Sequence, residues 1–95
     1  MKIKILDHLV LTVNNIEKSV QFYTEILGME KVIFGDDRIA LKFGDQKINL
    51  HQSDNPISPN AFKATEGSSD LCFIIDTPIR DSIIHLQNNK ITIIE

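Results

Sequence analysis

Apolar and polar side chains alternate along residues 5–13, which read Ile-Leu-Asp-His-Leu-Val-Leu-Thr-Val. A period of two residues is typical of a β-strand, because successive side chains of a strand lie on opposite faces. The apolar face of this predicted strand carries Ile5, Leu9, Leu11 and Val13. The other face carries His8, Val10 and Thr12, so His8 is placed on the side that is free to line a cavity.

The spacing of apolar residues then changes to that of a helix. Positions three or four residues apart are apolar at Ile16, Val20, Tyr23 and Leu27. This period predicts an amphipathic helix over residues 15–27. Asn14 with Glu17 three residues later matches an N-terminal capping box, and Gly28 supplies a C-terminal stop.

Three short strands are predicted after this helix. They span residues 31–34, 38–43 and 47–51, with turn residues at 35–37 and 44–46. Ile39, Leu41 and Phe43 share one face of the second strand, and Ile48 and Leu50 share one face of the third. These apolar faces need a cover, and the helix at 15–27 has the matching stripe. The first half is therefore predicted to be a β-α-β-β-β module with its helix on one side of a four-stranded sheet.

The opposite face of the predicted sheet is polar. By parity it carries Arg38, Ala40, Lys42, Lys47, Asn49 and His51. The cations Arg38, Lys42 and Lys47 would favour an anionic or carboxylate-bearing ligand if this face lines a cleft. The alternative is an ordinary solvated sheet face.

The opening pattern returns in the second half of the chain. Residues 53–69 contain prolines and small polar residues and are interpreted as a linker or lid. A strand is predicted at 70–76, then a helix with Thr77 as N-cap and a stop at Asn88-Asn89, and a final strand at 90–95. The inner stripe of this helix would be Ile79, Ile83 and Leu86, with His85 on the surface. Because Asp70 aligns with His8, an internal repeat is plausible.

Length and charge narrow the function classes. A chain of 95 residues allows one domain, and no apolar run approaches the roughly 20 residues that span a bilayer. The net charge is −3 without a Lys/Arg cluster, so a nucleic-acid partner is not expected. The first residues lack the apolar core of a signal peptide, and the single Cys72 cannot form an internal disulfide. A cytoplasmic protein without membrane contact is expected.

Several motifs resemble the opening of proteins of the glyoxalase, bleomycin-resistance and extradiol-dioxygenase superfamily, also called the vicinal oxygen chelate fold. They are Asp7-His8-Leu9-Val10-Leu11-Thr12-Val13, Phe22-Tyr23 and Ile26-Leu27-Gly28-Met29, with Ile48-Asn49-Leu50-His51 and Asp70-Leu71-Cys72-Phe73 further on. The resemblance implies an α+β fold of paired β-α-β-β-β modules around a cleft. This chain would be one domain over 1–95, with a complete first module at 1–52, a linker at 53–69 and an incomplete β-α-β second module at 70–95.

The resemblance also implies a divalent metal in the cleft, such as Zn, Ni, Mn, Fe or Co. By position, His8 matches the first ligand, Asn49 or His51 the fourth-strand ligand, and Asp70 the ligand that opens the second module. The usual glutamate on the last strand has no counterpart, so the catalytic base is unknown. Arg38, Lys42 and Asn49 are the candidates for substrate binding.

Three functions stay open at this point. One is a metal-dependent lyase or isomerase, similar to lactoylglutathione lyase, that acts on a small oxygen-rich substrate, with an anion as one option. Another is a metal-free small-molecule binding or resistance protein of the bleomycin-resistance type, and the third is an inactive truncated form. Exposed apolar edges in the second half further predict a homodimer. In one form of this dimer, the two chains would exchange modules.

Overall fold

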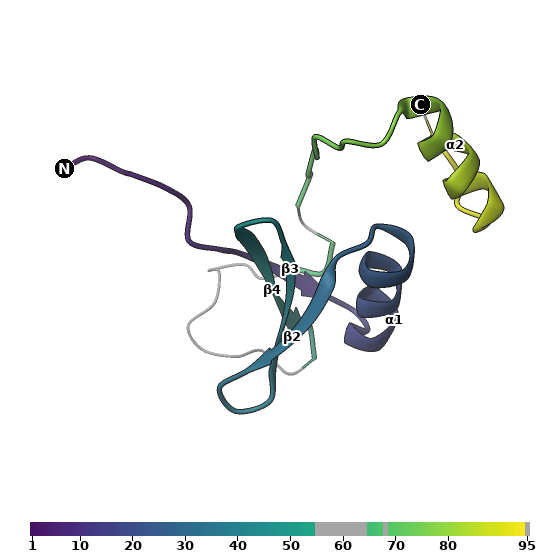
Figure 1. Ribbon diagram of the computed structural model, residues 1–95. Helices are drawn as coiled ribbons and strands as arrows, with labels where there is room; N and C mark the ends of the chain where they lie inside the picture. The colour runs from purple at the N-terminus through teal and green to yellow at the C-terminus, as the bar shows by residue number, and fades with distance from the viewer. Residues whose placement is uncertain (55–64, 68, 95) are drawn as a thin grey trace.

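The computed structural model describes residues 1–54, 65–67 and 69–94 and contains one four-stranded sheet and two separate helical segments. The strands are β1 (Leu9–Val13), β2 (Glu30–Phe34), β3 (Arg38–Phe43) and β4 (Gln46–Gln52). Between β1 and β2 the chain forms α1 (Ile16–Gln21) and a π-helical turn, η1 (Phe22–Ile26), and the second half contributes α2 (Ile79–Asn88). The sheet order is β1-β4-β3-β2, with β1 parallel to β4 and the other pairs antiparallel (Figure 1).

The hydrophobic core lies between the sheet and α1, as the sequence predicts. Its buried members are Leu11, Val13, Met29, Leu41, Ile48 and Leu50. Leu41 and Leu50 are the largest fully buried side chains among the described residues, and burial of a leucine stabilises a fold by about 1.5–3 kcal/mol. Ile16, Val20 and Tyr23 of the first helix pack against this cluster, which confirms the predicted stripe up to Tyr23. Leu27, predicted to belong to it, is exposed.

The first helix begins one residue later than predicted. Asn15, not Asn14, is the N-cap, and its side-chain Oδ1 accepts a hydrogen bond from the Lys18 amide at 3.0 Å. The Gln52 side chain joins this end of the helix to β4, since its Oε1 accepts from the Ile16 amide and its Nε2 donates to the Asn14 carbonyl. The start of the helix is thereby fixed to the last strand of the sheet.

The end of the first helix is wider than a regular α-helix. The Thr24 hydroxyl donates to the Val20 carbonyl at 2.7 Å, and such side-chain bonds compete with the helical ladder. The Leu27 amide bonds the carbonyl of Phe22, five residues earlier, which is the hydrogen-bond spacing of a π-helix. Gly28 then ends the segment with φ +76°, a left-handed conformation that glycine adopts without strain, as predicted.

Several predicted strand residues do not join the sheet. β1 starts at Leu9, the first residue with a partner on β4, and the preceding Ile5 is 75% exposed and not a core residue. The predicted strands at 70–76 and 90–95 were wrong over the described residues 70–76 and 90–94, which form no ladder. Alternation of side chains gives a segment strand character, but a strand also needs a neighbour to accept its hydrogen bonds. Phe73 instead packs edge-on against Phe43 of β3, with ring centroids 5.6 Å apart.

The second helix stands apart from the sheet and lies nearest the end of η1 (Figure 1). Its N-cap is Pro78 without a side-chain hydrogen bond, so the prediction of Thr77 was wrong. Ile79 and Ile83 of its apolar stripe are exposed. The predicted linker or lid at 53–69 lies largely outside the described residues. Within the described part of the chain, no helix has the length and apolar character needed to cross a membrane, and the cytoplasmic location stays a prediction.

Candidate functional site

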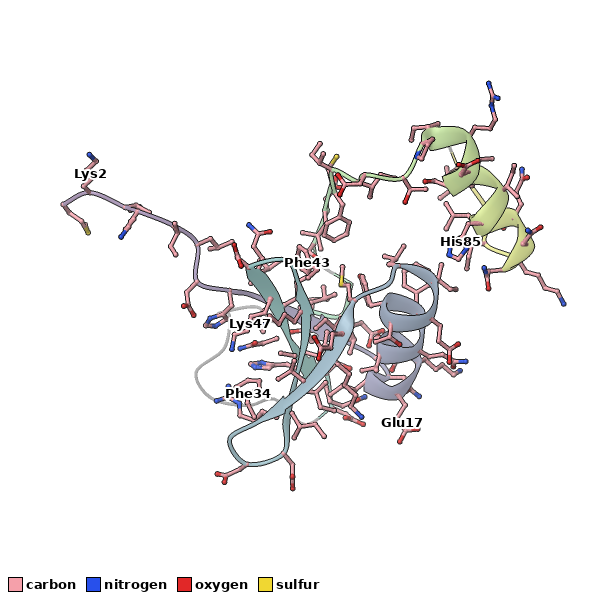
Figure 2. The ribbon with its side chains drawn as sticks, viewed as in Figure 1. Lys2, Glu17, Phe34, Phe43, Lys47 and His85 are labelled. Atoms are coloured by element: carbon pink, nitrogen blue, oxygen red, sulfur yellow. The ribbon has the colours of Figure 1, made fainter. Side chains whose placement is uncertain are left out.

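The face of the sheet opposite α1 carries the polar residues that the sequence singled out. Alternation along β4 brings Lys47, Asn49 and His51 to this face. The register places Val10 and Ala40 on either side of Asn49, and Thr12 of β1 beside His51. Figure 2 shows the labelled Lys47 and Phe34 on this side of the sheet, away from Glu17 on α1. We call it the polar face.

His51 and Asn49 are buried, and each has side-chain atoms that lack a hydrogen-bond partner among the described residues. Only 3% of His51 and 4% of Asn49 is exposed. Both ring nitrogens of His51 and the Oδ1 atom of Asn49 have no partner among the described residues. Leaving a buried polar group unsatisfied costs about 1–3 kcal/mol, and native proteins contain few such groups. The pair is therefore suited to receive a ligand.

The environment of His51 favours the neutral imidazole. Burial lowers the pKa of His51 below its ordinary value of 6.5, and the charges of Arg38 and then His8 lower the pKa further. Neutral imidazole keeps a lone pair on one ring nitrogen and a proton on the other. His51 can thus coordinate a metal ion through one nitrogen or exchange hydrogen bonds with a polar ligand.

His8 is paired with its neighbour in sequence. Its Nδ1 lies 2.7 Å from Oδ2 of Asp7, and about a third of its side chain is exposed. This hydrogen bond, followed by the charge of the imidazole, lowers the pKa of the Asp7 carboxyl. A carboxylate that accepts from one ring nitrogen orients the ring and leaves the other nitrogen available, as is common for metal-binding histidines.

Asp70 does not join the two histidines. It is exposed, and within residues 1–54, 65–67 and 69–94 no three His, Cys, Asp or Glu side chains gather closely enough to hold a metal ion. His8 and His51, by contrast, are near enough for the charge of one to act on the other. The charge of His8 therefore influences His51, whereas Asp70 stands apart from both. The metal-ligand roles of His8, His51 and Asp70 stay predictions.

The cations differ in their surroundings. The Arg38 guanidinium lies 5.2 Å from the centroid of the Phe34 ring, and Lys47 Nζ lies 4.4 Å from the same centroid. Arg38 and Lys47 are half-buried, whereas Lys42 is exposed. Phe34 was not singled out from the sequence, although its pairing opposite Arg38 in the β2–β3 hairpin would have placed it there.

A shallow pocket of about 180 Å³ adjoins this group. His8 lines it just before β1, Lys47 lines it from β4, and Leu71, Cys72 and Phe73 line it from the second half of the chain. Its surface is mostly apolar, which is usual for small-molecule sites with a few polar groups. Leu9, Phe43 and Ile48 of the covered face also line the pocket, so it is not part of the polar face alone.

Comparison with known proteins assigns the family. The Glyoxalase/Bleomycin resistance protein/Dioxygenase superfamily matches residues 5–89. The chain belongs to this superfamily. Its fold is the vicinal oxygen chelate fold, because it superposes with a TM-score of 0.95 on an integron cassette protein from the mobile metagenome of V. cholerae, at 53% identity, covering 100% of this chain and 74% of that one.

Two relatives are similar over nearly the whole chain. A virulence protein of Salmonella typhimurium is 49% identical over 90 residues, which is 95% of this chain and 62% of the relative. A glyoxalase domain-containing protein of Mycosarcoma maydis is 46% identical over 95 residues, 100% of this chain and 53% of the relative. The chain thus spans between half and two thirds of the length of these relatives.

More distant family members carry enzyme names. The metallothiol transferase FosB of Staphylococcus epidermidis is 30% identical over 95 residues, 98% of this chain and 66% of the relative. A lactoylglutathione lyase from Agrobacterium tumefaciens has a TM-score of 0.71 at 16% identity, covering 100% of this chain and 77% of that one, and this likeness concerns the fold alone.

Proposed function

We propose that this chain takes part in a divalent-metal-dependent enzyme of the lyase or isomerase type that acts on a small, oxygen-rich substrate. The observation that carries the proposal is His51, because both of its buried ring nitrogens lack a hydrogen-bond partner among the described residues and the charge of His8 acts on it. The name of the FosB relative, a metallothiol transferase, supports a role for a metal. Family members catalyse different reactions, so lyase or isomerase chemistry is the part of the proposal that rests on resemblance.

The proposed metal centre combines two imidazole rings, an orienting carboxylate and an amide oxygen. His51 and His8 are the imidazole ligands, Asp7 orients His8 through its 2.7 Å hydrogen bond, and Asn49 offers a buried amide oxygen. Imidazole suits Zn, Ni, Fe and Co, and the amide oxygen adds a harder donor of the kind that Mn accepts. A bound ion would supply Lewis-acid polarisation of the substrate oxygens. The low exposure of His51 and Asn49 strengthens electrostatic interactions with a bound substrate, because water screens less there.

A third ligand and a proton-transfer group must come from elsewhere. Asp70 is the sequence candidate for the ligand, but in the described chain it does not meet the histidines. We propose that a second copy of the chain brings its second half to the polar face, so that the unit is a homodimer with exchanged modules. The exposure of Ile74 and Ile94, 96% and 94%, supports such an association. Light scattering across a dilution series should show a dimer, and a monomer at every concentration would contradict this part.

The alternative is a metal-free binding protein of the bleomycin-resistance type. It is favoured by the lack of a three-ligand group among the described residues and by the cations of the polar face. In this case Asn49 and His51 would hydrogen-bond a ligand directly.

Metal binding to the purified full chain separates the two functions. After chelator treatment, Zn, Ni, Mn, Fe(II) and Co are added in turn, and bound metal and the melting temperature are measured. The proposal expects at least one metal to bind stoichiometrically and raise the melting temperature, since a ligand that binds the folded state stabilises it. His51→Leu should fold and lose binding, whereas the control Gln87→Leu, at an exposed position of α2, should retain it. No binding by any of the five metals would reject the enzyme function in favour of the alternative.

A further inference from the structure

Two cations from different strands share one aromatic ring on the polar face. Phe34 of β2 pairs directly with Arg38 of β3, and Lys47 reaches the same ring from β4. Lys47 pairs across the strands with Lys42, and like charges in that position repel. The Phe34 ring, with its negative π-face, gives Lys47 a favourable position away from Lys42.

The ring does not neutralise these charges. A cation over an aromatic face keeps its full charge and its hydrogen-bond donors. In the described chain, His8–Asp7 is the one ion pair, and neither Arg38 nor Lys47 has a carboxylate partner there. Asp7 senses the charge of Lys47 only weakly, as the last of several effects on it, and its carboxyl is hydrogen-bonded to His8.

Arg38 also has a buried donor without an acceptor. Its Nε is inaccessible to solvent and has no hydrogen-bond partner among the described residues. Ile39 pairs with Leu50, and Arg38 and His51 are the next residues along β3 and β4 beyond this pair. The ring nitrogens of His51 likewise have no hydrogen-bond partner among the described residues. The free donor therefore adjoins the residues proposed for the metal or ligand.

We propose that Phe34, Arg38 and Lys47 form a binding site for the oxyanion head of the substrate, a carboxylate or a phosphoryl or phosphonyl group. The guanidinium and the ammonium both donate charge-assisted hydrogen bonds to such oxygens. Phe34 holds the two cations in place, and Asn49 and His51 face the neighbouring oxygens of the same molecule. The role in catalysis rests on the proposed function, but oxyanion binding itself does not require the metal.

The test uses the chelator-treated, ¹⁵N-labelled full chain and titrates it with acetate, methylphosphonate and inorganic phosphate at constant ionic strength. Saturable shifts of the Arg38 Nε–H resonance are expected with at least one of these anions. Arg38→Gln and Lys47→Gln should each weaken binding about tenfold, the scale of a lost charge-assisted hydrogen bond. Phe34→Leu should weaken it about threefold. The matched control is Lys31→Gln, an exposed lysine of β2 that alternation places on the other face of the sheet from Phe34, and it should change affinity by less than about twofold.

The outcomes separate this inference from the metal proposal. Preference for acetate identifies a carboxylate head, and preference for methylphosphonate or phosphate identifies a phosphorus oxyanion; either supports the site. Equal loss in Lys31→Gln and Arg38→Gln, or absence of saturable binding, overturns it. Anion binding that needs added Zn and survives Arg38→Gln also overturns it while leaving the metal centre intact. Anion binding in a protein that binds no metal supports the site and rejects the enzyme.

Discussion

His85 on α2 donates a hydrogen bond from Nε2 to the main-chain carbonyl of Ile26, at the end of η1, 2.7 Å away. Figure 2 shows the His85 side chain on the side of α2 that faces the first module. The two residues are 59 positions apart, so this bond joins the two halves of the chain. The sequence placed His85 on the surface, and it is exposed, but its ring nitrogen is engaged.

Loss of this bond should detach α2. His85→Ala is expected to lower the free energy of unfolding by about 1 kcal/mol, the net value of one hydrogen bond, and to increase amide exchange in α2. Urea denaturation and hydrogen exchange measure the two effects. Gln87→Ala, at an exposed position of the same helix, is the control and should leave both unchanged within about 0.5 kcal/mol. Equal effects of the two variants would show that the bond does not hold the helix.

The Phe43–Phe73 contact should hold residues 70–76 against the sheet. An edge-to-face pair contributes about 0.5–1.5 kcal/mol, so Phe73→Ala should lower stability by about 1 kcal/mol and broaden the signals of Leu71 and Cys72. Asp76→Ala is the control, since Asp76 is an exposed residue of the same segment. Unchanged NMR signals in Phe73→Ala would mean that this segment is held by something else.

The position of the helix cap gives a paired test. Asn15→Ala removes the acceptor of the Lys18 amide and should cost about 1 kcal/mol of stability. Asn14→Ala, the residue that the sequence pattern favours, should cost less than about 0.5 kcal/mol, because Asn14 contributes only its main-chain carbonyl. Thermal and urea denaturation compare the two variants, and a larger loss in Asn14→Ala would reject the observed cap.

Acid should destabilise the metal-free protein through His51. Its pKa in the folded chain is below the ordinary 6.5, so on acidification the unfolded chain binds a proton first. Stability should therefore fall as the pH drops below about 6.5 and level off once His51 is protonated in the folded state. Melting temperatures between about pH 8 and pH 5 should decline less steeply in His51→Leu than in the unmodified chain. If the melting temperatures of the two proteins fall equally with pH, the pKa of His51 is not lowered in the folded chain.

Parity and spacing predicted the core well because it depends on local alternation. Leu41 and Leu50 were assigned to the covered face, and Arg38, Asn49 and His51 to the polar face, from their positions in the sequence alone. Lys42 and Lys47 have the same parity, so the sequence could not distinguish them. The register places Lys42 and Lys47 directly opposite each other, and Lys47 is the one whose ammonium lies over the Phe34 ring, a packing detail that the pattern of a single strand does not contain.

The second half was predicted less well for a related reason. Residues 70–76 alternate like β1, yet β1 is a strand because β4 offers it hydrogen-bond partners from Ile48 to Gln52. No pattern within a segment states whether a partner strand is present. The same limit applies to Asp70. It was predicted to be a metal ligand because it aligns with His8, but its neighbours depend on how the two halves assemble.

The parallel pairing of β1 with β4 has a consequence for the order of folding. The β2–β3 and β3–β4 hairpins close over short turns, whereas Leu9 must find Ile48 across α1 and two strands. Local pairings form before distant ones, since closing a longer loop costs more entropy. Val10 and Thr12 flank Asn49 and His51 only after β1 docks, so this part of the polar face should be completed last. A folding intermediate made of β2, β3 and β4 would already carry Phe34, Arg38 and Lys47 but would lack the strand that brings His8 to the site.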